Sequence, residues 1–250
     1  MHCKVYFFII LIACLTMTAC EQVIDVDLNE ASPRYVIEGT VTDSDGPHQV
    51  KVTQSKNFDE VDDFEGVDYA EVIISDDRDN SELLTYTDSG IYQGNDVDGT
   101  PGRTYSLTVT VEGETFTASS KMPEPVKFET LYIETITIFG LTINIPKIQY
   151  YDPEGIENYY RHVLFVNGEQ NNSIFVSSDA LYDGSQMERD LPLNYQEDGL
   201  TQGDTLLVKM QSIDEQSYEY FSSLIKTINR SAASPANPIT NISGGALGYF

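Results

Sequence analysis

The sequence predicts a mainly β protein: an immunoglobulin-like β-sandwich followed by a second β-rich domain with one amphipathic helix. Three observations support this fold class. Residues 104–111 alternate between apolar and hydroxyl side chains, which is the period of a half-buried strand. About seven short runs of strand length, separated by turn residues, fill the roughly 90 residues around it. Only the segment near residues 214–229 has apolar side chains at helical spacing.

The first 19 residues have the features of a signal peptide. Lys4 precedes an unbroken apolar run at residues 5–15, and small residues follow it. The run is shorter than the roughly 20 apolar residues that a membrane-spanning helix needs. Residues 15–20, Leu-Thr-Met-Thr-Ala-Cys, resemble the lipobox of bacterial lipoproteins, in which the cysteine thiol takes a diacylglycerol. We therefore expect residues 1–19 to be removed and Cys20 to be the lipid attachment site.

Residues 20–32 are expected to form an acidic tether between the lipid and the folded body, because they hold several acids and little apolar periodicity. The other two cysteines, Cys3 and Cys14, lie in the segment that would be removed, so no thiol would remain for a disulfide. Stability must then come from core burial. Several acyl chains would hold the protein firmly at the cell outer membrane. The sequence leaves open whether it faces the periplasm or the exterior.

The charge of the chain limits its partners. It has 14 basic and 40 acidic residues, a net charge of −26. A nucleic acid would be repelled over a Debye length of about 8 Å, and no basic stripe offsets that repulsion. Nucleic acid is therefore excluded as a partner. The same charge disfavours direct contact with anionic headgroups, so membrane contact is expected through the lipid anchor alone.

The immunoglobulin-like sandwich is expected at residues 33–123. In its clearest strand, residues 104–111, one face is apolar and would be buried in an antiparallel sheet. Turns rich in aspartate and glycine separate the remaining runs. These further expected strands lie at residues 35–41, 48–53, 70–75, 83–87 and 115–119.

The second β-rich domain is expected at residues 126–250. Pro123-Glu124-Pro125 marks the boundary, because neither proline can donate to a ladder and the pair stiffens a linker. A hairpin of residues 131–138 and 141–145 is expected to turn at Phe139-Gly140. Later strands are expected at residues 147–151, 159–166, 174–178 and 205–213.

A helix near residues 214–229 is expected to pack as a lid on the second sheet. Ser212 and Glu215 have the spacing of a capping box at its start. Lys226 and Arg230 lie near its end, where the helix dipole favours cations. Its inner face would consist of Tyr218, Phe221, Ile225 and Ile228.

The sequence carries no motif that identifies an enzyme. His48 and His162 are the only histidines past the signal peptide, and neither has the spacing of a zinc site. Ser223 and Lys226 match the Ser-x-x-Lys motif of penicillin-binding enzymes. The match lies within an expected amphipathic helix and the companion motifs are missing, so we interpret it as a chance match. Carboxylates are abundant enough that folding could bring together a pair suited to glycoside hydrolysis. A solvated acidic surface is the simpler interpretation. We expect a non-enzymatic protein with no catalytic residues, no cofactor and no specific metal.

Four acidic clusters resemble calcium loops only in part. They lie at residues 43–46, 59–63, 76–80 and 95–99, and two contain Asp-x-Asp-Gly without the later glutamate that a calcium loop needs. Turn formation is the favoured interpretation, with at most weak, millimolar calcium binding. The chain has 16 tyrosines, and a tyrosine in a strand more often packs in the core or pairs across strands than contacts a ligand. The ligand-binding residues are therefore unknown from the sequence.

Several short motifs follow one another along nearly the whole processed chain. Together they resemble one family: lipoproteins of Bacteroidota-type bacteria whose shared domain has no assigned function and which are often encoded beside TonB-dependent receptors. The motifs are Cys20-Glu21, Tyr35-Val36-Ile37-Glu38-Gly39, Gly90-Ile91-Tyr92, Gly102-Arg103-Thr104-Tyr105-Ser106-Leu107, Asn158-Tyr159-Tyr160-Arg161 and Gly244-Gly245-Ala246-Leu247-Gly248-Tyr249-Phe250.

The resemblance implies a non-catalytic accessory or ligand-binding lipoprotein of the outer membrane that works with a TonB-dependent transporter. The alternative is a surface structural or adhesive lipoprotein that binds a protein or polysaccharide without a transporter. Co-purification of a stoichiometric β-barrel partner distinguishes the two hypotheses. Both rest on the lipid anchor at Cys20.

Overall fold

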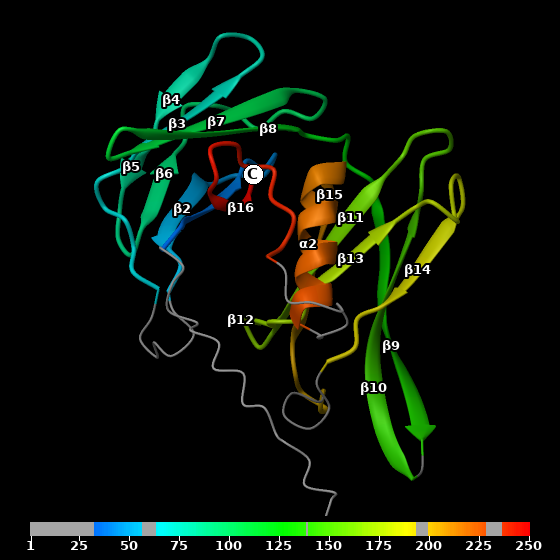
Figure 1. Ribbon diagram of the computed structural model, residues 1–250. Coiled ribbons are helices and arrows are strands. Elements are labelled where there is room, and N and C mark those ends of the chain that lie inside the picture. The colour runs from blue at the N-terminus through cyan, green and yellow to red at the C-terminus, as the bar shows by residue number, and fades with distance from the viewer. Residues whose placement is uncertain (1–32, 57–63, 139, 194–199, 229–236) are drawn as a thin grey trace, which may run out of the picture. The chain divides into compact units, whose positions relative to one another are not determined.

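About half of the described chain is in β-strands, with one helix among them (Figure 1). The computed structural model describes residues 33–56, 64–138, 140–193, 200–228 and 237–250. All of these described residues belong to one compact unit. The expected signal peptide, the attachment site Cys20 and the tether lie outside the described residues.

Two sheets make up the first part of the fold, with strand orders β16-β1-β2-β6-β5 and β4-β3-β7-β8. Apart from β16, their strands come from the first half of the chain. They are β1 (Tyr35–Thr40), β2 (His48–Gln54), β3 (Glu71–Asp76), β4 (Ser81–Leu83), β5 (Thr85–Tyr86), β6 (Ile91–Gly94), β7 (Thr104–Val111) and β8 (Glu114–Lys121).

The two sheets share one hydrophobic core. Strand β7 contributes every second residue to it, namely Tyr105, Leu107, Val109 and Val111, as the alternating pattern predicts. Ile37, Val50 and Val52 of the other sheet are fully buried in the same cluster. The expected mainly β, sandwich-like arrangement is thereby confirmed.

The run at residues 83–87 does not form the single strand that the sequence predicts. Leu83 ends β4 and pairs with Ile73, whereas Thr85 begins β5 in the other sheet. Leu84 lies between the two strands, is buried, and donates its backbone N–H to Val72 O at 2.8 Å. The chain thus crosses from one sheet to the other here, which a period-two pattern cannot reveal.

The C-terminal segment returns to this first core. Strand β16 (Leu247–Tyr249) pairs in parallel with β1, opposing Ile37 with Gly248. A side chain at Gly248 would place its Cβ 1.8 Å from Ile37 O, and its φ is +108°, so only glycine fits. Ile242, Ala246 and Phe250 are buried in the same cluster. Residues expected in the second domain thus complete the first core.

Strands of the second half form two further sheets, with orders β14-β10-β9 and β12-β11-β13, and β15 pairs with β11. A second cluster, built around Ile148, Tyr150, Tyr160 and Leu164, forms their core. The strands are β9 (Phe128–Ile138), β10 (Leu141–Tyr151), β11 (Tyr159–Val166), β12 (Glu169–Gln170), β13 (Phe175–Ser178), β14 (Gln186–Asp190) and β15 (Leu206–Ile213).

Two strands were expected at residues 141–145 and 147–151, but the structure has one continuous strand, β10, that includes Pro146. Pro146 pairs with Ile133 of β9, and β10 continues to Tyr151. Pro146 lies just past the last pair of β10 with β14, Lys147 with Asp190, and its carbonyl accepts from Leu191 N at 2.9 Å. The proline is tolerated because it stands where this pairing ends, so its missing N–H interrupts no later bond of the ladder.

Helix α2 (Glu215–Ile228) contacts β11 and β13, as expected for a lid on the second sheets, and also β16 (Figure 1). The predicted capping box is wrong. Ser212 lies in β15 opposite Tyr160, and the N-cap is Asp214, whose Oδ1 accepts from Ser217 N at 2.8 Å.

The buried face of α2 also differs from the expected one. Its buried residues are Ser217, Tyr220 and Phe221, and Ile228 is 62% exposed. The inner face is rotated relative to the apolar stripe because α2 packs against β16 as well as against the second sheets.

Candidate functional site

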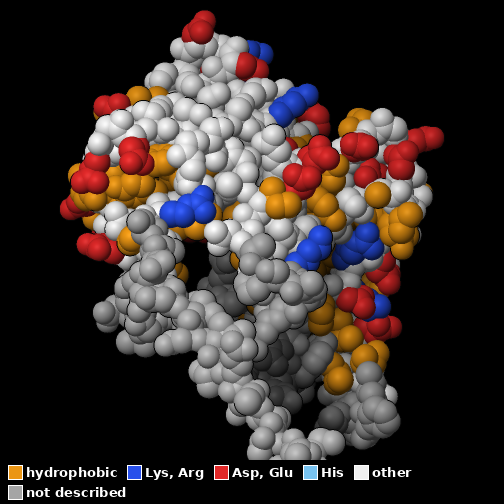
Figure 2. Space-filling view, in the orientation of Figure 1, with side chains coloured by type: hydrophobic (Ala, Val, Ile, Leu, Met, Phe, Trp, Pro, Cys, Tyr) orange, Lys and Arg blue, Asp and Glu red, His pale blue; other side chains and the backbone are white. Residues whose placement is uncertain are grey.

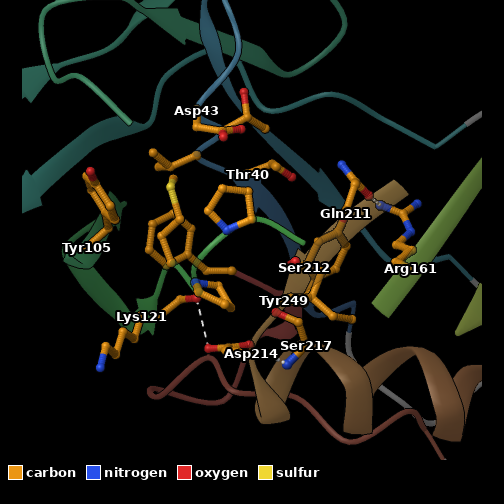
Figure 3. A pocket seen from close by; sticks show the side chains of 18 of the residues that line it. Thr40, Asp43, Tyr105, Lys121, Arg161, Gln211, Ser212, Asp214, Ser217 and Tyr249 are labelled. Carbon is orange, nitrogen blue, oxygen red and sulfur yellow. Dashed lines mark hydrogen bonds between the residues drawn. The ribbon is translucent and has the colours of Figure 1, made fainter. Parts of the chain in front are cut away.

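A cavity of about 510 Å³ lies where segments from both halves of the chain come together. Figure 3 shows their side chains around a common space. A cavity of this size, mostly apolar with a few polar groups, is typical of small-molecule sites. The apolar and aromatic lining residues are Val41, Tyr105, Met122, Pro123, Pro125, Val126, Met210, Ile213, Phe221, Tyr249 and Phe250. The charged ones are Asp43, Lys121, Arg161, Lys209 and Asp214.

Hydrogen bonds hold the cavity walls in place. Met122, at the start of the linker, donates its N–H to Arg103 O at 2.9 Å and accepts from Gly102 N at 2.8 Å. At the end of β8, the Ser120 hydroxyl donates to Asp214 Oδ2 at 2.8 Å (Figure 3). The linker and the start of α2 are therefore both fixed to the sandwich.

One wall of the cavity is an aromatic cluster. Phe221 and Tyr249 have ring centroids 4.8 Å apart, and Tyr220 lies 4.8 Å from Tyr249 and 5.2 Å from Phe221. The guanidinium of Arg161 stacks over Phe221, with its central carbon 4.2 Å from the ring centroid. Arg161 Nη1 also donates to Gln211 Oε1, at 3.4 Å. A cation is thus held at the edge of an apolar wall.

Burial keeps the hydroxyls of this wall protonated. Desolvation raises the pKa of Tyr220 to about 12, and the nearby Glu38 charge adds to the increase. Desolvation also raises the pKa of Tyr249, and Arg161 opposes that shift while Glu38 supports it. Both tyrosines therefore present neutral hydroxyl groups beside Arg161.

The histidines and the Ser-x-x-Lys match lie away from the cavity lining. His48 is buried in β2, with Nε2 2.6 Å from Val97 O. His162 is buried in the second core, where desolvation lowers its pKa to about 4. Ser223 donates to Tyr220 O and accepts from Ile239 N, both at 2.8 Å, as a structural helix residue does.

Two of the flagged acidic clusters serve turns. Asp76 accepts hydrogen bonds from the backbone N–H groups of Arg78 and Asn80 and pairs with Arg103 at 2.6 Å. Burial alone would raise the pKa of Asp76, but these bonds lower it to about 2. The turn at residues 95–97 donates three backbone N–H groups to Glu82. The cluster at residues 59–63 lies outside the described residues.

A different acidic group escaped the sequence analysis. Carboxylate oxygens of Asp152, Asp179 and Asp183 lie within 4.8 Å of one another, and the first two residues are buried. Tyr160 donates to Asp152, while desolvation raises the pKa of that carboxyl group. Chemically, three such oxygens are ligands that a hard cation accepts. No sequence motif joins these residues, because 27 positions separate the first two.

No helix in the described part of the chain has the length and apolar character that a membrane crossing requires. A comparison with curated proteins finds no match. A family model described as "Domain of unknown function (DUF4249)" matches residues 21–250, which is nearly the whole chain. The chain therefore belongs to this family, the DUF4249 domain of unknown function.

Proposed function

We propose that this protein is an outer-membrane lipoprotein, anchored through Cys20, that binds a small ligand as a non-catalytic accessory of a TonB-dependent transporter. The observation that carries the ligand-binding part is the cavity of about 510 Å³. Its walls come from both cores, so a bound molecule would bridge them. Binding there would stabilise the folded protein, by an amount that rises with the logarithm of the ligand concentration above the Kd.

The anchoring part rests on the lipobox at residues 15–20. A Cys20→Ser substitution removes the only thiol that the processed chain would keep. After cell fractionation, the wild-type protein is expected in the outer membrane and the Cys20→Ser protein in the soluble fraction. A Cys20→Ser protein that still sediments with the envelope through a membrane wash would overturn the anchoring proposal.

The transporter part rests on the resemblance and is tested by co-purification. The affinity-tagged lipoprotein is extracted in mild detergent and its partners are identified by mass spectrometry. We expect a stoichiometric TonB-dependent receptor. A chain that elutes alone from an extract that contains the receptor contradicts this part and leaves the anchor and the cavity standing.

One observation favours a surface structural or adhesive role as the second candidate. Ile156, Leu181 and Tyr182 are exposed on two loops, and Leu181 is 87% exposed. Tyr151, at the end of β10, is exposed next to the first loop. Gly155 N donates to Asp183 Oδ1 at 2.7 Å, which joins these loops. Exposed apolar side chains gathered in this way suit contact with a protein or polysaccharide. Co-purification of such a partner in place of a receptor would favour this role.

A further inference from the structure

Arg161 differs from Arg103 and Lys147, two cations that this fold shields well. Arg189 is also half-buried and makes no ion pair with the described residues, but it does not line the cavity. Arg103 pairs with Asp76 and Asp77, at 2.6 and 3.0 Å. Lys147 lies within 3.6 Å of the carboxylates of Glu134, Glu188 and Asp190. Arg161 is half-buried in the cavity wall and makes no ion pair with any carboxylate of the described residues. Its hydrogen-bond partners among the described residues are neutral: the Gln211 amide oxygen, at 3.4 Å, and the Tyr249 hydroxyl group.

This lack of a carboxylate is informative because of the composition. The chain has 40 acidic residues and 14 basic ones, so potential acidic partners far outnumber the cations. Figure 2 shows many acidic side chains and few basic ones on the face it presents. A half-buried guanidinium that is left without an acid therefore keeps its capacity for an anion from outside the chain.

The position of Arg161 is also fixed in advance. Phe221, 5% exposed, supports one face of the guanidinium, and Gln211 lies directly opposite Arg161 on the neighbouring strand β15. Figure 3 shows the side chains of Arg161 and Gln211 on the same side of the cavity. A guanidinium held in this way offers its remaining N–H groups in the planar fork that matches a carboxylate or sulfonate. Little side-chain entropy is then lost on binding.

The other two basic lining residues do not provide an equivalent site. The amine of Lys121 is directed away from the cavity in Figure 3. Lys209 is exposed, and its amine lies 5.2 Å from the centre of the Phe165 ring. One cation thus faces an otherwise mainly apolar and aromatic space.

Acidic groups around the cavity limit the charge of a ligand. Asp43 and Asp214 belong to the lining, and Glu38 acts electrostatically on the aromatic cluster. Both oxygens of Asp214 already accept hydrogen bonds, from Ser217 and Ser120. A second negative charge on the ligand would meet these carboxylates without a second cation to balance it.

We propose that the cavity binds a singly charged organic anion with an apolar or aromatic body, whose carboxylate or sulfonate group pairs with Arg161. This inference rests on the proposed function of the cavity as a ligand site. It adds the chemical class of the ligand and the residue that selects it.

A matched pair of fluorescent probes tests separately whether the cavity binds a ligand and whether Arg161 selects an anion. 8-Anilinonaphthalene-1-sulfonate carries one sulfonate, and N-phenyl-1-naphthylamine has the same aromatic skeleton without it. Each is titrated into the full processed chain carrying Cys20→Ser, which needs no detergent. The chain has no tryptophan, so tryptophan fluorescence does not interfere. The sulfonate is expected to bind at one site and more tightly than the neutral probe.

Substitutions then locate the anion contact. Arg161→Gln is expected to weaken sulfonate binding about tenfold or more, because a charge-assisted hydrogen bond is lost, and to leave binding of the neutral probe within about twofold. Arg78→Gln makes the same charge change on an exposed turn and should alter neither affinity. Glu38→Gln should strengthen sulfonate binding, since a nearby negative charge is removed. Melting curves confirm that each variant is folded.

The outcomes separate the two proposals. If both probes bind and Arg161→Gln weakens them equally or not at all, the anion inference fails and the cavity remains a ligand site. If neither probe binds the folded protein, the cavity is not a site for molecules of this class, and the ligand-binding part of the proposed function fails with the inference.

Discussion

Ser120 and Asp214 join the two halves of the fold through a single hydrogen bond of 2.8 Å. Ser120 lies at the end of β8, and Asp214 caps α2 through its other carboxylate oxygen. One carboxylate therefore fixes the start of the helix and its attachment to the sandwich, and both residues line the cavity. The geometry of the cavity depends on this contact.

Asp214→Ala should lower the free energy of unfolding by about 2 kcal/mol, since it removes a helix cap and a hydrogen bond. Ser120→Ala should cost about 1 kcal/mol alone and almost nothing in the Asp214→Ala background, because the shared bond is already gone. Urea denaturation of the two single variants and the double variant measures this. Additive losses would show that the two residues are not coupled.

Leu107→Asp should unfold the sandwich. Leu107 is 1% exposed within the first core, and an unpaired buried carboxylate costs several kcal/mol against a net stability of about 5–15 kcal/mol. The matched control is Ser106→Asp, which places the same group on the exposed face of the same strand. Circular dichroism melting compares them. Equal melting temperatures would contradict the assignment of the buried face of β7.

His162 should make the protein less stable in mild acid. Desolvation lowers the pKa of folded His162 to about 4, below its usual value of 6.5. The unfolded chain therefore takes up a proton that the folded chain refuses, and stability falls as the pH drops from about 6.5 toward 4. The shift corresponds to about 3 kcal/mol.

His162→Phe removes this titration and should flatten the decline between pH 6.5 and 4. Nε2 of His162 has no hydrogen-bond partner among the described residues, so the substitution leaves no new unpaired group. Unfolding free energies of both proteins at several pH values give the result. Parallel curves would mean that His162 is not the group responsible.

Sequence patterns predicted the elements whose burial is set by their own periodicity. Strand β11 spans Tyr159–Val166, as expected, and β7 spans Thr104–Val111. The buried face of α2 was predicted less well because packing against β16 rotates it. The parallel pairing of β16 with β1 joins residues more than 200 positions apart, and no local pattern encodes it.

The cavity could not be predicted for the same reason. Its lining comes from six separate stretches of the chain, and Arg161 looked like one more polar position of a strand. Its distinguishing property is a place in the cavity wall without an acidic partner among the described residues, which only the fold reveals. The motif Asn158-Tyr159-Tyr160-Arg161 supports the family resemblance but does not indicate a ligand site.

The chemical state of Cys20 decides whether this protein is a lipoprotein. Mass spectrometry of the N-terminal peptide of protein extracted from outer membranes measures that state. We expect the peptide to begin at Cys20 and to carry the mass of a diacylglycerol with further acylation at the amine. A peptide that begins elsewhere, or a Cys20 without lipid, would contradict the account.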